Sequence, residues 1–153
     1  MSQFAATTSV PVEKSRAEIE KLLTRYGASR FGSGWDEKTA TILFEAKNRR
    51  VKFTLPLPSR ADRAIAKDRR GYSLPSSKVE IKFEQACRQR WRSLALVIKA
   101  KLEAVESGVS EFESEFLAHI VLPGGSTVGE TLRPQLVHAY ETGTMPPLLG
   151  SGS

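Results

Sequence analysis

The chain has 153 residues and a net charge of +6, with 40% hydrophobic and 26% charged residues. This length fits one domain that buries its own core, and the composition excludes a wholly disordered chain. No stretch approaches the length of a membrane-spanning helix, about 18 apolar residues, and residues 1–11 lack the features of a signal peptide. Cys87 is the single cysteine, which excludes an internal disulfide and fits a cytoplasmic protein.

The charge is distributed unevenly along the chain. Residues 58–102 hold twelve Lys/Arg against four Asp/Glu, whereas residues 103–153 hold Arg133 alone against seven glutamates. Such polarity is typical of a protein whose basic part binds a polyanion. The alternative is that the basic and acidic regions face one another, either within one chain or across a homodimer.

The first helix is expected after a flexible tail over residues 1–11. Ser15 and Glu18 have the S-x-x-E spacing of a capping box, in which each side chain accepts a hydrogen bond from the other residue's backbone. Apolar residues then recur with the period of one helical face, at Ile19, Leu22, Leu23 and Tyr26. Gly27 is expected to end this helix.

Three antiparallel strands are expected next, over residues 28–35, 39–47 and 51–57. The last two alternate apolar and polar residues, and Asn48-Arg49 is expected to form their hairpin turn because Asn tolerates a positive φ. Gly32 and Gly34 weaken the first strand, which indicates an edge position or the close approach of another backbone. A three-stranded meander is not stable alone in water, so a helix must cover its apolar face.

A helix over residues 76–108 is the element expected to cover the sheet. Its apolar residues are spaced by three and four, which is the pattern of one buried face held for about six turns. They are Phe83, Cys87, Trp91, Leu94, Ile98, Leu102 and Val105. Ser76 or Ser77 is expected to cap its start, and Gly108 is expected to end it in a left-handed conformation.

Residues 58–78, between the last strand and this helix, contain helix breakers and no sustained periodicity, and we expect them to form a loop. Six Lys/Arg outnumber two aspartates in this segment. A loop of this length inside a compact domain is usually functional or disordered. Its expected anchors are Ile65, Tyr72 and Leu74.

Two short helices are expected in the acidic C-terminal third. The segments Ser110–Glu113 and Thr127–Glu130 repeat the capping-box spacing. Pro134 is expected either to limit the second helix to a turn or to permit a fresh start, since Pro is favoured at a first helical position. The last packing face is expected at Leu136, Val137 and Tyr140. With residues 144–153 as an extended arm, the sequence predicts a single α+β domain over residues 12–143.

No pattern in the sequence gives positive evidence for catalysis, a metal or a cofactor. Asp36, Glu45 and Lys47 follow the D…E-x-K order of metal-dependent nucleases, whose two carboxylates must share a magnesium ion. The expected strands place Asp36 and Glu45 at opposite ends of a hairpin, roughly 20 Å apart at about 3.3 Å per residue. The histidines, His119 and His138, have no second ligand at metal spacing. We therefore expect a protein that is not an enzyme.

Nucleic-acid binding is the function class that the residues favour. The segment from Arg60 to Lys101 concentrates cations, which neutralise phosphates and release their counterions. Trp35 is a candidate for stacking on unpaired bases. The expected phosphate-binding residues are Arg60, Arg63, Lys67, Arg69, Arg70, Arg88 and Arg92. The alternative is that these arginines form a solvated face or pair with carboxylates.

Most of the chain resembles a family of small proteins carried by temperate phages and prophages. The resemblance rests on VPVEKSRAEIEKLLTRYGA at 10–28, VKFTLPLP at 51–58, RQRWRSLALVIKAKLEAVESG at 88–108, FLAHIVLPGGSTVGE at 116–130 and MPPLL at 145–149. It assigns no catalytic or binding residue to this chain. It implies a protein of the bacterial host's cytoplasm that serves replication, recombination or interference with host defence.

Together these features predict a non-enzymatic accessory protein that binds DNA or RNA, single-stranded or structured, through the basic loop and the long helix. The competing prediction is a protein-binding inhibitor or adaptor that acts on a host or phage enzyme through its C-terminal segments. Salt separates the two predictions, because phosphate binding weakens steeply with salt and a packed protein interface does not.

Overall fold

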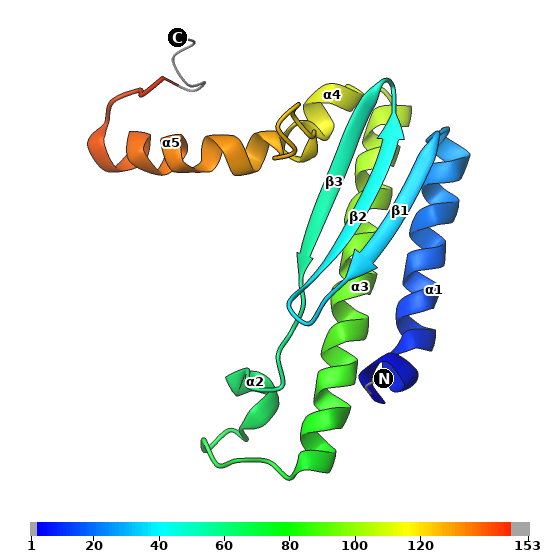
Figure 1. Cartoon of the computed structure of the whole chain (residues 1–153), viewed down its shortest axis with the longest axis vertical. Coiled ribbons are helices and arrows are strands. Elements are labelled where there is room, and N and C mark those ends of the chain that lie inside the picture. The colour runs from blue at the N-terminus through cyan, green and yellow to red at the C-terminus, as the bar shows by residue number, and fades with distance from the viewer. Residues whose placement is uncertain (1–2, 148–153) are drawn as a thin grey trace.

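The computed structural model describes the backbone of residues 3–147 and the side chains of residues 12–147. The fold is α+β, as expected, with a three-stranded antiparallel sheet lying over two long helices (Figure 1). The elements are α1 (Gln3–Tyr26), β1 (Arg30–Trp35), β2 (Thr39–Ala46), β3 (Arg49–Pro56), α2 (Arg63–Ala66), α3 (Ser76–Glu106), α4 (Phe112–Glu115), the 3-10 helix η1 (Leu117–His119) and α5 (Val128–Thr142).

The apolar stripe of α3 is buried over most of its length, as its spacing predicts. The buried residues of the stripe are Phe83, Cys87, Trp91, Leu94, Ile98 and Leu102, and Ala95 is buried with them. Gly108 has a φ of +82°, which confirms the left-handed stop. The expected serine cap is wrong, because the N-cap residue is Pro75 and no side chain bonds to the helix start.

Helix α1 packs beside α3 and runs in the same direction (Figure 1). It begins at Gln3 rather than at Ser15, so the residues of the expected cap lie inside one continuous helix. Val12 is buried, seven residues before the fully buried Ile19. Seven residues are about two turns, so the buried face extends toward the N-terminus beyond the expected start. Gly27 has a φ of +106° directly after the helix ends at Tyr26.

The sheet has the order β1-β2-β3, which places the glycine-containing β1 at an edge, as expected. Among the described residues, no atom of a non-neighbouring residue lies within 4 Å of where a Cβ on Gly32 or Gly34 would be, so none of their backbone approaches there. The face of the sheet that turns toward the helices is apolar. Its buried residues are Ala40, Ile42, Phe44, Ala46, Val51 and Phe53.

The hairpin turn between β2 and β3 lies at Lys47–Asn48, one residue earlier than expected. Both residues have a positive φ, 53° and 61°, as a two-residue type I′ turn requires. In this register Glu45 lies opposite Arg30 on one side and opposite Arg50 on the other. Opposite charges on neighbouring strands stabilise a sheet.

The segment after α3 packs against the end of the core formed by β2 and β3, and α5 follows it. Phe116 is fully buried, and its ring meets those of Phe44 and Phe53 edge-on at 5.8 and 6.2 Å. The backbone N–H of Val121 then donates to the carbonyl of Arg50, so this segment lies along β3. The capping box expected at Ser110 is absent, because the N-cap of α4 is Glu111 and has no side-chain bond.

Helix α5 projects sideways from this end of the molecule (Figure 1). The capping box expected at Thr127 and Glu130 is present, and the helix continues through Pro134 to Thr142. None of its residues is buried, so the packing face expected at Leu136, Val137 and Tyr140 is wrong. Residues 145–147 of the expected arm form neither helix nor strand, and residues 148–153 lie outside the described residues.

The burial of α3 makes a quantitative prediction about stability. Trp91 is 2% exposed in the core, whereas Leu96 on the outer side of the same helix is 60% exposed. We expect Trp91→Ala to lower the free energy of unfolding by about 3–5 kcal/mol. Leu96→Ala, the matched control, should change it by less than about 0.5 kcal/mol. Urea unfolding followed by circular dichroism measures both values, and equal effects would contradict the observed packing.

Candidate nucleic-acid interface

The basic loop is an ordered structure that packs on the first turns of α3. Its short helix α2 buries Ile65 against Phe83 and Cys87, and these three residues form a small apolar cluster separate from the main core. Ile65 is therefore an anchor, as expected, and Leu74 is half-buried. Tyr72 is 68% exposed, so the expectation that it anchors the loop is wrong.

A tight turn holds Arg69 and Arg70 at the tip of this loop. The backbone N–H of Gly71 donates to the carbonyl of Asp68, which makes Arg69 and Arg70 the two central residues of a β-turn. The Asp68 carboxylate accepts hydrogen bonds from the backbone N–H groups of Arg70 and Tyr72. The Asp68 carboxylate, next to Arg69 in the sequence, is thus bonded to the backbone, and Arg69 and Arg70 are both exposed.

Two further cations of the loop stand close to this turn. The ammonium of Lys67 donates to the hydroxyl of Ser73 across the base of the turn, at 2.9 Å. The guanidinium of Arg63 lies beside the backbone at Gly71. Within the part of the chain that the structure describes, Arg63, Arg69 and Arg70 form no ion pair with a carboxylate. These residues form a compact basic surface, which we call the loop surface: Arg63, Lys67, Arg69 and Arg70.

Arg60 pairs with a carboxylate, which is the alternative that the sequence left open for the predicted phosphate-binding arginines. Its guanidinium donates two hydrogen bonds to the carboxylate of Glu80, at 2.6 and 2.7 Å, and lies 4.0 Å from the centre of the Phe83 ring. The hydrogen bond from Arg60 lowers the pKa of Glu80, and the same bond raises the pKa of Arg60. Arg60 therefore ties the start of the loop to α3 and is a poor candidate for binding phosphate.

The two α3 cations predicted for the site lie on another side of the molecule. Between them on the helix, Arg90 donates to the carbonyl of Pro56 at the end of β3. Residues two apart on a helix differ by about 200° in direction. Arg88 and Arg92 therefore point away from Arg90. Arg92 shares its side of α3 with Lys99, seven residues on, and Lys99 lines a groove with residues of α1. Arg88 and Arg92 therefore lie toward α1, and the structure does not join them to the loop surface.

Trp35 is the last residue of the edge strand β1, whose arrow in Figure 1 points toward the half of the molecule that carries the loop. It pairs with Ala40 and is 48% exposed. A hollow of about 870 Å³ connects this end of the sheet to the loop, and it is lined by the β1–β2 turn residues Glu37 and Lys38 and by Arg60 and Glu80. Neither Trp35 nor a residue of the loop surface lines this hollow, so the structure does not join Trp35 to the loop cations.

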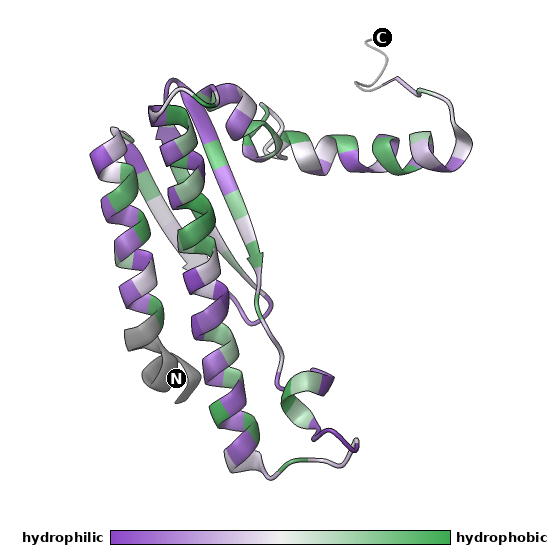
Figure 2. Cartoon of the chain, turned by 180° about the vertical axis from the view of Figure 1, so that it is seen from behind, coloured by the Kyte–Doolittle hydropathy of each residue, from purple (hydrophilic) through white to green (hydrophobic). Residues whose placement is uncertain are grey.

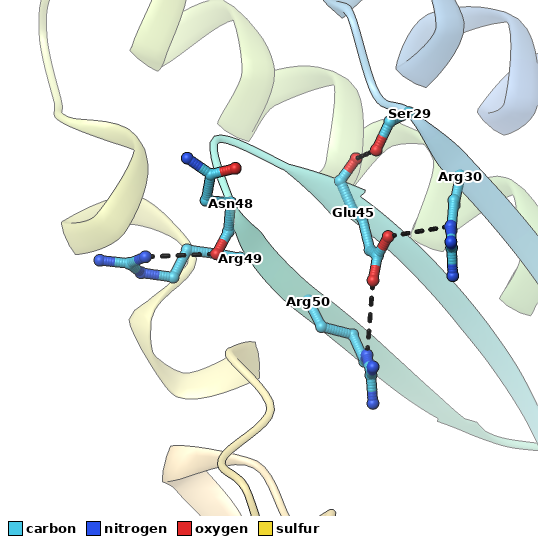
Figure 3. A network of polar contacts seen from close by, with 6 residues as sticks. All are labelled: Ser29, Arg30, Glu45, Asn48, Arg49 and Arg50. Atoms are coloured by element: carbon cyan, nitrogen blue, oxygen red, sulfur yellow. Dashed lines mark hydrogen bonds and ion pairs between the residues drawn. The ribbon is translucent and has the colours of Figure 1, made fainter.

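A second group of charges, which the sequence analysis missed, lies on the opposite face of the sheet (Figure 3). Arg30 and Arg50 stand on either side of Glu45, with ion-pair distances of 3.3 and 3.7 Å. Both arginines are largely exposed, but they share this carboxylate, so the group has a smaller excess of positive charge than the loop surface. Predicting this group of charges from the sequence would have required the register of both strand pairs.

Among the described residues, the acidic C-terminal third forms no ion pair with the loop surface. Three of its glutamates form ion pairs with cations at the other end of the molecule: Glu113 with Arg49, Glu115 with Lys101 and Glu130 with Lys52. In Figure 1 this end carries α4 and α5, whereas α2 and the loop lie at the other. The alternative in which acidic and basic regions neutralise each other within one chain is therefore wrong for the loop surface.

The residues weighed for metal chemistry are far apart or bonded elsewhere. The carboxylate of Asp36 accepts two backbone hydrogen bonds in its own turn, at the opposite end of β2 from Glu45. His119 is stacked on Phe53 at 4.0 Å, and burial lowers its pKa. Among residues 12–147, no three His, Cys, Asp or Glu side chains lie close enough together to hold a metal ion.

The described chain also contains no helix that is long and apolar enough to cross a membrane.

No protein-family model matches the chain, and no curated protein or solved structure is detectably similar to it.

The packing of the loop predicts the reactivity of the single thiol. Burial beneath Ile65 raises the pKa of Cys87 to about 11, and a thiol reacts as its thiolate. We expect native Cys87 to react with a disulfide reagent only when the loop opens. Ile65→Ala should speed this labelling by about tenfold or more, because it leaves a cavity at the loop's anchor.

Tyr72→Ala is the matched control, since it removes a large exposed side chain from the same loop. It should leave the labelling rate of Cys87 unchanged. A fast, equal rate in all three proteins would show that the loop does not cover Cys87.

Proposed function

We propose that this protein binds the phosphate backbone of nucleic acid through its loop surface. The observation that supports this most strongly is the pair Arg69 and Arg70, held by an ordered turn at the tip of the loop without a carboxylate partner among the described residues. Placing arginines in a fixed turn lowers the entropy lost on binding. Exposed cations held in this way neutralise phosphates and displace the counterions that surround them.

The form of the surface favours backbone contacts over the reading of sequence. Sequence readout requires side chains aimed at base edges from an element that enters a groove, and here the cations sit on the tip of a short turn. Trp35, half-exposed at the edge of the sheet, is suited to stack on an unpaired base. A single-stranded or structured nucleic acid is therefore the substrate that these residues fit best.

The resemblance to small proteins of temperate phages and prophages supports the biological setting of this proposal. The protein acts in the cytoplasm of a bacterial host, as a non-enzymatic accessory factor of replication or recombination. Its contribution is to bind and hold nucleic acid while other proteins act on it.

The loop surface predicts a specific dependence on salt. We expect wild-type protein to bind a labelled single strand at low salt, with an affinity that falls steeply as salt rises. Arg69→Glu/Arg70→Glu should weaken binding at least about tenfold at low salt. It should also lower the slope of log affinity against log salt by about 1.4, since each phosphate contact to a single strand contributes about 0.7. Fluorescence anisotropy at several salt concentrations measures both.

The matched control is Lys21→Glu/Arg25→Glu, which makes the same change in net charge on the exposed side of α1. It should reduce binding much less than the loop variant. Equal losses in the two variants would mean that only net charge matters, and the absence of binding by wild-type protein at low salt would rule out the proposed function.

A protein-binding inhibitor or adaptor is the second candidate function. The observation in its favour is that α5 exposes an apolar face, which the core of this chain does not cover. Such a protein would retain its partner at high salt, because the buried apolar interface is insensitive to ionic strength. Retention of a partner at high salt by the Arg69→Glu/Arg70→Glu variant would favour this second function.

A further inference from the structure

Helix α5 is anchored firmly at its base although the rest of it contacts little of the chain. Its first turn is fixed by the capping box of Thr127 and Glu130, and Lys52 lies 3.4 Å from the same glutamate. A Cβ on Gly129 would lie 3.0 Å from the carbonyl oxygen of Ala118, so the helix approaches η1 as closely as a glycine allows. These contacts fix the direction in which the helix projects.

Beyond this first turn, α5 has the features of a helix that needs a partner. Helices of about 15 residues are marginally stable alone in water, and most gain their stability from packing of an apolar face. Pro134 weakens this one further, because it has no N–H to donate to the carbonyl of Glu130. Yet Leu136 and Val137 are 57% and 50% exposed, and Tyr140 is 85% exposed. Figure 2 shows apolar residues along α5 where it extends beyond the body.

The order of residues along the outer side of this helix is self-complementary. One row, at intervals of four, is Leu132, Leu136 and Tyr140, of which Leu132 is half-buried and the other two are exposed. The neighbouring row, Arg133, Val137 and Glu141, is exposed throughout. The second row has an apolar centre and opposite charges at its two ends. Reversing the direction of the row therefore places each charge opposite its complement.

Arg133 and Glu141 do not satisfy one another within a single chain. They are eight residues apart, which is about 12 Å along a helix, and ion pairs form within about 4 Å. Neither forms an ion pair with another of the described residues. Both become paired when a second α5 lies antiparallel to the first.

We infer that α5 is a dimerisation helix, which packs antiparallel against the α5 of a second copy of this chain about a two-fold axis near Leu136 and Val137. In this arrangement Leu132 of each copy meets Tyr140 of its partner, and each Arg133 meets the partner's Glu141. Interdigitation of the rows spaced by four residues is the commonest way in which helices pack. A two-fold axis also makes the contact closed, so that it yields dimers rather than filaments.

This inference is independent of nucleic-acid binding, because α5 and the loop surface lie at opposite ends of the molecule (Figure 1). It gives the dimer two loop surfaces, one at the far end of each copy. Two linked sites raise the avidity for a long strand without any new contact.

Sedimentation equilibrium of the full chain, from about 1 to about 300 μM, tests the inference. We expect a reversible dimer in the wild-type protein. Leu136→Glu places a charge at the centre of the contact and should raise the dissociation constant by about a hundredfold. His138→Glu, on the opposite side of α5, is the matched control and should leave it unchanged. Circular dichroism verifies that each variant is folded.

The charge pair provides a second test of the antiparallel arrangement. Arg133→Glu and Glu141→Arg should each weaken the dimer, since each places like charges opposite one another. The double variant Arg133→Glu/Glu141→Arg should restore the wild-type dissociation constant, because the exchange recreates both pairs. A monomeric wild-type protein, a dimer insensitive to Leu136→Glu, or a double variant no better than the single ones would overturn the inference.

Discussion

The burial of one face of α3 is the interaction on which the rest of the structure depends. Trp91 and Ile98 lie on that face in the main core, where both the sheet and α1 pack against them. The same face continues toward the N-terminus as Phe83 and Cys87, beyond the sheet, and there the basic loop covers it with Ile65. One continuous stripe thus organises both the core and the site. The acidic segments follow the other end of α3, so the two charged regions of the chain are kept apart.

Much of the fold was predictable because periodicity reports burial directly. The long helix, the three strands and the order of elements all follow from the spacing of apolar residues. Capping patterns were less informative: S-x-x-E at Thr127 forms a capping box, whereas the same spacing at Ser15 lies within a longer helix. A capping box forms only where a helix begins, and tertiary packing decides where that is. The four residues of the motif do not show how the rest of the chain packs. Alternation likewise leaves the hairpin turn open by one residue, because a turn placed one residue later keeps the same side chains on the same face of the sheet.

The candidate site was predictable in composition but not in geometry. The sequence identifies the cations, and it does not show which of them have partners. Arg60 is bonded to Glu80, twenty residues away. Arg88 points away from Arg90 because residues two apart on a helix differ by about 200° in direction. Arg69 and Arg70 remain exposed because a nearby aspartate bonds to the backbone of their turn. The spacing of apolar residues on α5 predicts a packing face, and the structure leaves that face exposed. Periodicity alone does not show whether an apolar stripe packs within its own chain or against another protein.

The measurement that tests the central claim most directly is amide hydrogen exchange of the full chain with and without a single-stranded oligonucleotide at low salt. The account predicts slower exchange over residues 60–74 and the first turns of α3, where the loop is held in place by the bound phosphates. Exchange in α5 should be the same in both samples at equal protein concentration. Protection of α5 with an unchanged loop, or no protection anywhere despite bound oligonucleotide, would contradict the assignment of the loop surface.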